Sequence, residues 1–301
     1  QERTSAYFAD LTLKYKGFLT LNGAYRYDKS STLPLEANGF DFYTYGAVVD
    51  VTNAIPGLKG DYVNFINLRG SYASVGSSPT NVRGSSTRGF LNELYSTPAG
   101  FPFGSTIGLG VPTAGATANL TPEFTKTMEF GIDMAFFNNR LDVKANYYVS
   151  NTTDQFNTLS VSAASGMSLY KLNSGEVENK GFELDVDVTV LRNEDFTWKI
   201  GGNLSKIKNK VISLGSGVDR AQVGLASTGD QTGIYAQVGQ SYPSIFAPAY
   251  VRDDAGRVII DQSTGDPVIS SELKNLGQTT PDLILGFNTS FTYKGITLSA
   301  V

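Results

Sequence analysis

The chain has 301 residues, of which 41% are hydrophobic and 17% charged, with a formal net charge of −4. Lys and Arg are scattered singly, which argues against a nucleic-acid-binding protein, because that class usually carries a basic stripe or patch. The sequence contains neither Cys nor His, so disulfides, thiolate metal sites and cysteine nucleophiles are excluded and the commonest general base is missing. We therefore expect no catalytic residue, metal site or cofactor, and no enzymatic activity.

Glycine and aromatic residues dominate the rest of the composition, with 32 Gly, 18 Phe and 16 Tyr against a single Trp. This composition favours an all-β chain. No apolar run approaches 18 residues, so the sequence predicts no transmembrane helix. The chain starts at Gln1 without a signal peptide and ends within a pattern typical of a strand, so we expect it to be a fragment of a longer protein.

The first expected hairpin joins residues 7–16 to residues 19–28 across Lys16-Gly17. Apolar and polar residues alternate in both halves, which is the pattern of strands with one apolar and one polar face. The apolar positions of the first half are Tyr7, Ala9, Leu11, Leu13 and Tyr15, and those of the second are Leu19, Leu21, Gly23, Tyr25 and Tyr27.

A less regular pair of strands follows at about 40–51 and 63–75, and three further hairpins repeat the first pattern. Their short turns are Asn138 to Arg140, Arg192 to Asp195, and Lys294-Gly295. The clearest alternation is that of Met128, Phe130, Ile132, Met134 and Phe136 against Thr127, Glu129, Gly131, Asp133 and Ala135. The sequence thus predicts about ten strands.

The connections between strands alternate between short turns and long segments. The long segments cover about 76–122, 151–176 and 213–281. Short turns at one end and long loops at the other are typical of outer-membrane β-barrels. Strands of about ten residues, aromatic residues at strand ends and acidic inward faces also favour a barrel. A soluble β-sandwich remains an alternative, because its strands alternate in the same way.

Three local patterns have chemical interpretations that we do not favour. The acidic segment around Asp253 and Asp254 misses the spacing of an EF-hand calcium loop, and a small hairpin with Asp-Gly turns explains it better. Glu129 with Asp133, and Glu183 with Asp187, resemble catalytic carboxylate pairs, but on strands they would face the lumen and contact the pore or a plug. The Gly201-Gly202 pair precedes no helix and is therefore no phosphate-binding loop.

The candidate binding residues are aromatic residues in the long segments, because binding residues concentrate on loops held by a rigid scaffold. Their rings would stack on sugar rings or on peptide side chains. The alternative is that they pack the loops against one another or against a partner. The candidates are Tyr95, Phe101, Phe103, Tyr235, Tyr242 and Phe246.

Several motifs resemble the SusC/RagA-like, TonB-dependent outer-membrane transporters. The motif Asn173-Ser174-Gly175-Glu176 through Asn179-Lys180-Gly181-Phe182-Glu183 is similar to the family's turn into a strand, and is the most specific of them. Further similar segments lie in family order along nearly the whole chain. They are Tyr25 to Ser31, Ile66 to Gly76, Asn119 to Glu123, Glu129 to Asp133, Asn139 to Leu141, Tyr147-Tyr148, Val238 to Ser241, and Thr280 to Asp282.

The resemblance implies a fold and a function. The chain would be the middle-to-late part of an antiparallel transmembrane barrel of about 22 strands in the bacterial outer membrane. The family's plug domain, TonB-contacting segment and C-terminal strands lie outside it. The implied function is TonB-dependent uptake of an oligosaccharide or a peptide, with a SusD-like surface lipoprotein and the TonB complex as partners. A passive porin-like channel and a soluble, glycan-binding sandwich or adhesin are the alternatives.

Overall fold

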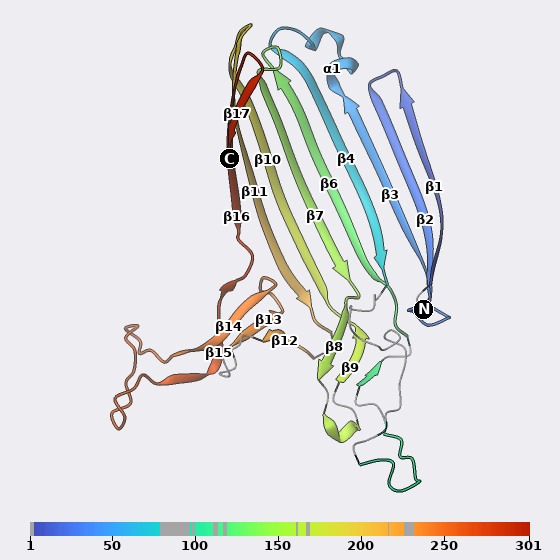
Figure 1. Cartoon of the computed structure of the whole chain (residues 1–301), viewed down its shortest axis with the longest axis vertical. Helices are drawn as coiled ribbons and strands as arrows, with labels where there is room; N and C mark the ends of the chain where they lie inside the picture. The colour runs from blue at the N-terminus through green and yellow to red at the C-terminus, as the bar shows by residue number, and fades with distance from the viewer. Residues whose placement is uncertain are drawn as a thin grey trace.

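The computed structural model describes most of the chain, and most of the described residues belong to three β-sheets (Figure 1). The described residues are 3–78, 97, 100–110, 114–116, 119–160, 162–166, 169–215, 217–225 and 232–301.

The largest sheet has ten strands, which confirms the number expected from the alternation. Every neighbouring pair is antiparallel, and the order in the sheet follows the order in the chain. The strands are β1 (Thr4–Tyr15), β2 (Leu19–Ser30), β3 (Gly39–Asp50), β4 (Val63–Ser77), β6 (Glu123–Phe136), β7 (Leu141–Thr153), β10 (Glu176–Arg192), β11 (Phe196–Ser213), β16 (Leu283–Tyr293) and β17 (Ile296–Ala300).

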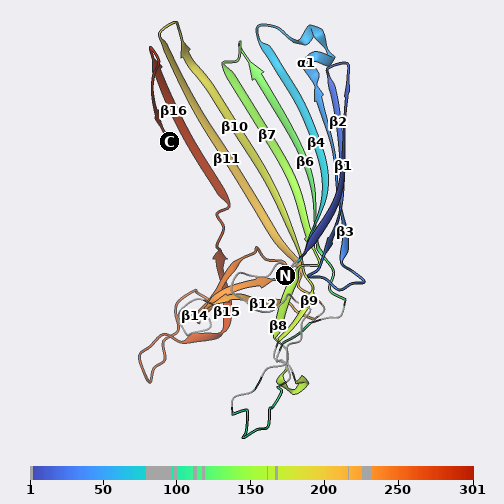
Figure 2. The same ribbon diagram turned by 45° about the vertical axis from the view of Figure 1, so that its right-hand side comes forward.

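The sheet is a tall, curved wall that does not close on itself (Figure 2). Its two edges are β1 and β17, which lie at opposite ends of the strand order. Nine of its strands contain 11 to 18 residues, whereas strands of soluble proteins average about five or six. A wall this tall suits a membrane barrel better than a sandwich.

The strand register gives the wall two chemically different faces, because residues paired directly across antiparallel strands lie on the same face. We call one the apolar face; it includes Leu13, Leu21, Phe130, Tyr147, Phe182, Leu184, Leu204 and Leu285. We call the other the polar face; it includes Lys14, Arg69, Asn146, Glu183, Asp185, Asn203 and Ser205. The predicted alternation is therefore confirmed.

Tight turns close the hairpins at one end of the wall. Lys16 and Gly17 both have positive φ, as do Lys294 and Gly295. Two consecutive residues with positive φ match the right-handed twist of the flanking strands, which is why the second is glycine in both turns. The connection between β3 and β4 lies at the same end and forms helix α1 (Val51–Ala54) and the 3₁₀ turn η1 (Pro56–Leu58) (Figure 1).

The long segments at the opposite end contain strands of their own. One forms a four-stranded sheet, which we call the loop sheet: β12 (Arg220–Leu225), β13 (Gly233–Gln237), β14 (Ser244–Tyr250) and β15 (Ile269–Gln278). Another sheet combines β5 (Ala114–Ala116), β8 (Phe156–Ser160) and β9 (Leu169–Asn173), with the 3₁₀ turn η2 (Ala163–Ser165) between the last two. All of these strands but β15 have seven residues or fewer, and β15 shows no regular alternation, so the sequence indicated only loops. No helix in the described part of the chain is long and apolar enough to cross a membrane.

Two small hydrophobic clusters fasten these segments to the wall. Leu33, Phe40 and Leu120 form the first, and Phe42, Phe124 and Phe156 pack around it. Leu120 has no exposed surface, although it lies in a connection rather than in a strand. The cluster therefore ties the β2–β3 and β4–β6 connections to the start of β8.

We predict that Leu120→Ala in the full-length protein loosens these connections without unfolding the wall. Truncating a buried leucine costs about 2–5 kcal/mol, which should raise proteolytic cleavage around residues 31–38 and 119–123 at least about ten-fold. Limited proteolysis followed by mass spectrometry measures this. Leu109→Ala is the control, because Leu109 is exposed. Equal protection of the native and Leu120→Ala proteins would show that the cluster does not hold the connections.

Candidate functional site

The centre of the polar face carries a dense set of opposite charges. Arg69 of β4 donates a hydrogen bond through Nη1 to Oδ2 of Asp133 on β6, at 3.3 Å. Lys144 of β7 lies in register between Asp133 and Asp185 of β10. Both partners of the ion pair are partly exposed, so it contributes little to stability. The charges instead make this surface strongly hydrophilic.

A shallow hollow of about 340 Å³ lies over this part of the polar face. Its lining comes from β4, β7, β10 and β11, so four strands contribute to one surface. The polar lining residues are Arg69, Lys144, Asn146, Glu183, Asp185, Asn203 and Ser205. Side chains of this kind can hydrogen-bond water, a polar ligand or a polar protein segment.

Several buried polar atoms of the described polar face lack a hydrogen-bond partner. They are Asn67 Oδ1, Arg69 Nε, Asp133 Oδ1 and Asn146 Oδ1. Leaving such a group unpaired costs about 1–3 kcal/mol, and lipid offers no partner. Arg69, Lys144 and Glu183 line the hollow with charged groups, so the polar face must lie against water or against a hydrogen-bonding segment, whereas the apolar face suits lipid.

The acidic pairs singled out in the sequence lie on this polar face, but each pair lies along one strand. Glu129 and Asp133 are four residues apart on β6, as are Glu183 and Asp187 on β10, which is about 13 Å along a strand. Carboxylates that flank one glycosidic bond lie about 5–9.5 Å apart. This geometry favours a role in lining the wall over catalysis.

The loop sheet is fastened to the wall by hydrogen bonds at the end of β11. The Val211 amide donates to the Gln240 carbonyl at 2.9 Å, and the Gly239 amide donates to the Val211 carbonyl at 2.8 Å. The Asn209 side chain accepts from the Tyr242 amide at 2.9 Å and donates to the Tyr242 carbonyl. Asn209 belongs to the polar face, so the loop sheet attaches on that side of the wall.

A second hydrophobic cluster completes this attachment. Val177 of β10 and Val211 of β11 pack with Leu214 and with Ala236 of the loop sheet, and Tyr242 packs against the cluster. Val177 and Val211 are paired in register and continue the polar face toward the long-loop end. Apolar side chains thus replace polar ones where the loop sheet packs against the wall.

The predicted binding aromatics fall into different environments. Tyr235 and Phe246 are 8% and 3% exposed and contact each other edge-to-face, with ring centroids 5.4 Å apart. Phe101 and Phe103 are 41% and 80% exposed. Tyr242 is half-buried against the hydrophobic cluster. Tyr95 lies outside the described residues. The exposed rings of Phe101 and Phe103 are thus available to a ligand, while the other three described rings pack within the loops.

Two residues that the sequence analysis did not select organise this end of the protein. The Arg220 guanidinium lies over the rings of Tyr235 and Phe246, 5.5 Å and 5.4 Å from their centroids. Asn209 holds the loop backbone at Tyr242. Neither has a local signal in the sequence, because both act on residues that lie at least 15 positions away.

The acidic segment of the β14–β15 connection forms the predicted hairpin. Bridges join Arg252 to Val258 and Ile260 to Pro267, and Gly256 and Gly265 turn the chain with positive φ. The Asp253 carboxylate accepts hydrogen bonds from the Arg257 amide and side chain, and these bonds hold the pKa of Asp253 below its usual value. Within the described residues, no three acidic side chains gather as metal ligands.

The two-faced antiparallel wall defines this chain as part of a transmembrane β-barrel. Residues 1–300 match the family described as "TonB dependent receptor-like, beta-barrel", and the chain belongs to that family. The fold expected from the sequence is confirmed.

The relatives carry names that agree with this family. The chain is 28% identical over 315 residues to TonB-dependent receptor P26 of Formosa agariphila, covering 98% of this chain and 31% of that protein. It is 25% identical over 219 residues to TonB-dependent receptor SusC of Bacteroides thetaiotaomicron, covering 69% of this chain and 22% of that protein. The resemblance to the SusC type is thereby confirmed. The chain spans less than a third of the length of these two relatives.

A solved structure has the same fold. The RagAB peptide transporter aligns with 99% of this chain and 33% of its own, with a TM-score of 0.80 at 21% identity. The "open-open" state of the RagAB peptide importer gives a TM-score of 0.79 at 20% identity. At this identity the likeness shows the fold alone.

We predict that Asn209→Ala in the full-length protein releases the loop sheet from the wall. Both hydrogen bonds to the Tyr242 backbone disappear, so hydrogen exchange of the Tyr242 amide should accelerate about ten-fold. Peptide-resolved exchange with mass spectrometry measures it. Asn179→Ala is the matched control, because Asn179 is the residue paired with Asn209 on β10. Equal acceleration in both variants would contradict a specific attachment through Asn209.

We predict that the hairpin at 252–267 opens in acid. The folded pKa of Asp253 is lowered, so its contribution to stability is full above the ordinary pKa and is lost as pH falls through the folded pKa. Hydrogen exchange of this segment, corrected for the intrinsic pH dependence, should therefore rise below about pH 4. Because hydrogen bonds from Ser263 also lower the pKa of Asp261, the double variant D253N/D261N should remove most of that pH dependence, and Asp253→Asn alone a part of it. A segment equally protected at pH 3 and pH 7 would contradict the prediction.

Proposed function

We propose that this chain forms part of the wall and the extracellular mouth of a TonB-dependent nutrient importer of the SusC type in the bacterial outer membrane. Its substrate is an oligosaccharide or a peptide. Short turns of such barrels lie in the periplasm and long loops outside the cell, so the loop sheet lies at the extracellular mouth.

The polar face is the observation that carries the proposal. Its charged and polar side chains require water or a hydrogen-bonding segment. In a barrel the inner surface supplies this environment. A plug domain from outside this chain would contact the same surface. The passage of a polar solute also requires a polar inner surface.

The loops support a role in substrate capture. The loop sheet is fixed by Asn209 and Val211 on the polar side of the wall, where a solute enters. Phe101 and Phe103 are exposed and offer rings that stack on sugars or on peptide side chains. Exposed rings on the long loops suit a site that selects its solute before transport.

Exposed apolar side chains at the same end support a protein partner. They are Tyr250, Ile269 and Leu276, which line one hollow on the loop sheet. Exposed apolar residues that lie together outside the membrane span are typical of an interaction surface. A SusD-like surface lipoprotein fits this place, and its presence as a lid is part of the proposal. The TonB complex acts through segments outside this chain.

The test uses the full-length protein, purified from outer membranes in mild detergent. A SusD-like lipoprotein in stoichiometric amount, identified by mass spectrometry, is the expected result. Uptake of the captured oligosaccharide or peptide should also stop when an uncoupler collapses the proton gradient. Recovery in the soluble fraction without detergent would overturn the proposal. Uptake that is insensitive to the uncoupler, with no lipoprotein bound, would establish a passive porin-like channel instead.

We predict that a charge on the apolar face destabilises the barrel far more than the same charge on the polar face. Val186→Arg should lower the free energy of unfolding by about 2–4 kcal/mol, because Val186 lies on the apolar face and is paired with Gly202, near the middle of that face on β11. Asn203→Arg, the matched control on the neighbouring strand, should change it by less than about 1 kcal/mol. Denaturant titration of the full-length protein in lipid vesicles measures both. Equal losses of stability in the two variants would contradict the assignment of the apolar face to lipid and of the polar face to water.

A further inference from the structure

Lysines replace apolar residues at one end of the apolar face. On β11 this face presents Phe196, Trp198, Ile200, Gly202 and Leu204, and then Lys206, Lys208 and Lys210 at the next positions toward the long-loop end. All three lysines are exposed. They point away from the polar face, so they do not line the path of a solute.

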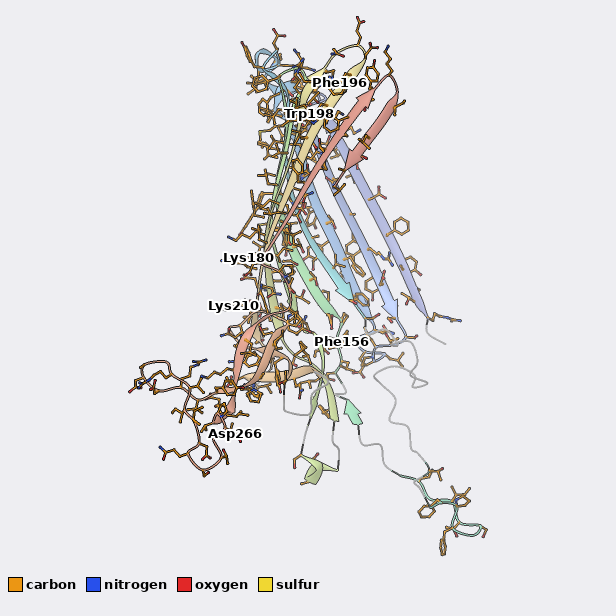
Figure 3. The ribbon with its side chains drawn as sticks, turned by 60° about the vertical axis from the view of Figure 1, so that its left-hand side comes forward. Phe156, Lys180, Phe196, Trp198, Lys210 and Asp266 are labelled. Atoms are coloured by element: carbon orange, nitrogen blue, oxygen red, sulfur yellow. The ribbon has the colours of Figure 1, made fainter. Side chains whose placement is uncertain are left out.

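Neighbouring strands extend this group. Lys180 of β10 is paired in register with Lys208, and Lys126 of β6 lies on the same row as Lys210. We call Lys126, Lys180, Lys206, Lys208 and Lys210 the basic strip. Figure 3 places Lys180 and Lys210 between the aromatic residues Phe196 and Trp198 at one end of the wall and the loop residue Asp266 at the other.

The acidic residues on this part of the apolar face do not neutralise the strip. Glu178 binds Lys180, with 2.9 Å between Oε1 and Nζ, and Glu176 accepts a hydrogen bond from Asn151. The strip therefore has five lysines against two glutamates. Lys180 and Lys208 lie directly opposite each other, and like charges in that position destabilise a sheet. An anion bound between them would remove this repulsion.

The depth of the strip follows from strand geometry. Phe196 and Lys206 are ten residues apart on β11, or about 33 Å along the strand at about 3.3 Å per residue. A tilt of about 40° reduces this to about 25 Å, which is the height of the apolar band of such barrels. Trp198 and Phe291 stack at 5.5 Å near the other end and suit the opposite boundary. Lys206 thus lies at the edge of the hydrocarbon, and Lys208 and Lys210 lie in the headgroup layer.

We propose that the basic strip binds the phosphate groups of lipid headgroups in the outer leaflet of the membrane. Lysine ammonium groups pair with phosphate as compact point charges. Spaced on alternate positions of neighbouring strands, they form a surface that an extended, multiply phosphorylated headgroup can span. The assignment to the outer leaflet rests on the proposed function, which places the long loops outside the cell.

The experiment compares two triple variants of the full-length protein. K206Q/K208Q/K210Q removes three charges from the basic strip. K14Q/K16Q/K199Q is the matched control, because it removes three charges from the polar face and from the short β1–β2 turn, outside both the basic strip and the polar hollow. Each protein is purified from outer membranes and delipidated in detergent, and its affinity for added lipid A is measured by native mass spectrometry. The same measurement is repeated with lipid A whose phosphates have been removed enzymatically.

The strip variant should bind lipid A at least about ten-fold more weakly than the native protein, because each lysine near an anionic headgroup contributes roughly five-fold. The control variant should bind like the native protein, and dephosphorylated lipid A should bind weakly to all three. Undiminished binding by the strip variant, or equal loss in the control, would overturn the inference, as would equal binding of dephosphorylated lipid A.

Failure of the lipid-binding inference can be distinguished from failure of the proposed function. The charge changes are on exposed side chains, so all three proteins should insert into the outer membrane and retain the co-purifying lipoprotein. Loss of lipid binding with an intact lipoprotein complex supports both proposals. An intact complex with unchanged lipid binding refutes the lipid inference alone, and recovery without detergent refutes the proposed function.

Discussion

Backbone hydrogen bonding between long antiparallel strands is the interaction on which the rest of this structure depends. In lipid, every amide and carbonyl group must be paired within the protein, and a continuous ladder of neighbouring strands meets this requirement. The ladder also fixes register, and register decides which side chains share a face. A shift of one residue in the pairing of β10 with β11 would exchange Leu184 for Asp185 on the lipid side.

The two faces produced by this ladder have different tasks. The apolar face allows the wall to exist in a membrane, while the polar face creates a surface that requires water or a hydrogen-bonding partner. The Arg69–Asp133 ion pair contributes little stability, and the unpartnered atoms around it cost free energy. The stability of this part of the wall therefore comes from the strands that carry it.

The boundaries of the wall show a second use of the same alternation. Toward the short turns, aromatic residues such as Trp198 and Phe291 occupy the apolar face. Toward the long loops, lysines occupy it on β10 and β11, while Val177 and Val211 on the polar face receive the loop sheet. Polar and apolar residues thus exchange faces at the long-loop end of the wall. On the polar face the exchange matches the docked loop sheet, and on the apolar face it matches the proposed contact with lipid headgroups.

The sequence by itself determined the strands, their faces and the short turns, because each depends on neighbouring residues: alternation such as Met128 to Phe136, or a glycine after Lys16. The family followed from motifs of the same local kind. Only the tertiary structure decided how the long segments are built. The burial of Tyr235 and Phe246, the position of Arg220 above them and the attachment at Asn209 join residues distant in the chain. The basic strip likewise depended on register between strands, which brings Lys180 opposite Lys208 although 27 intervening residues separate them.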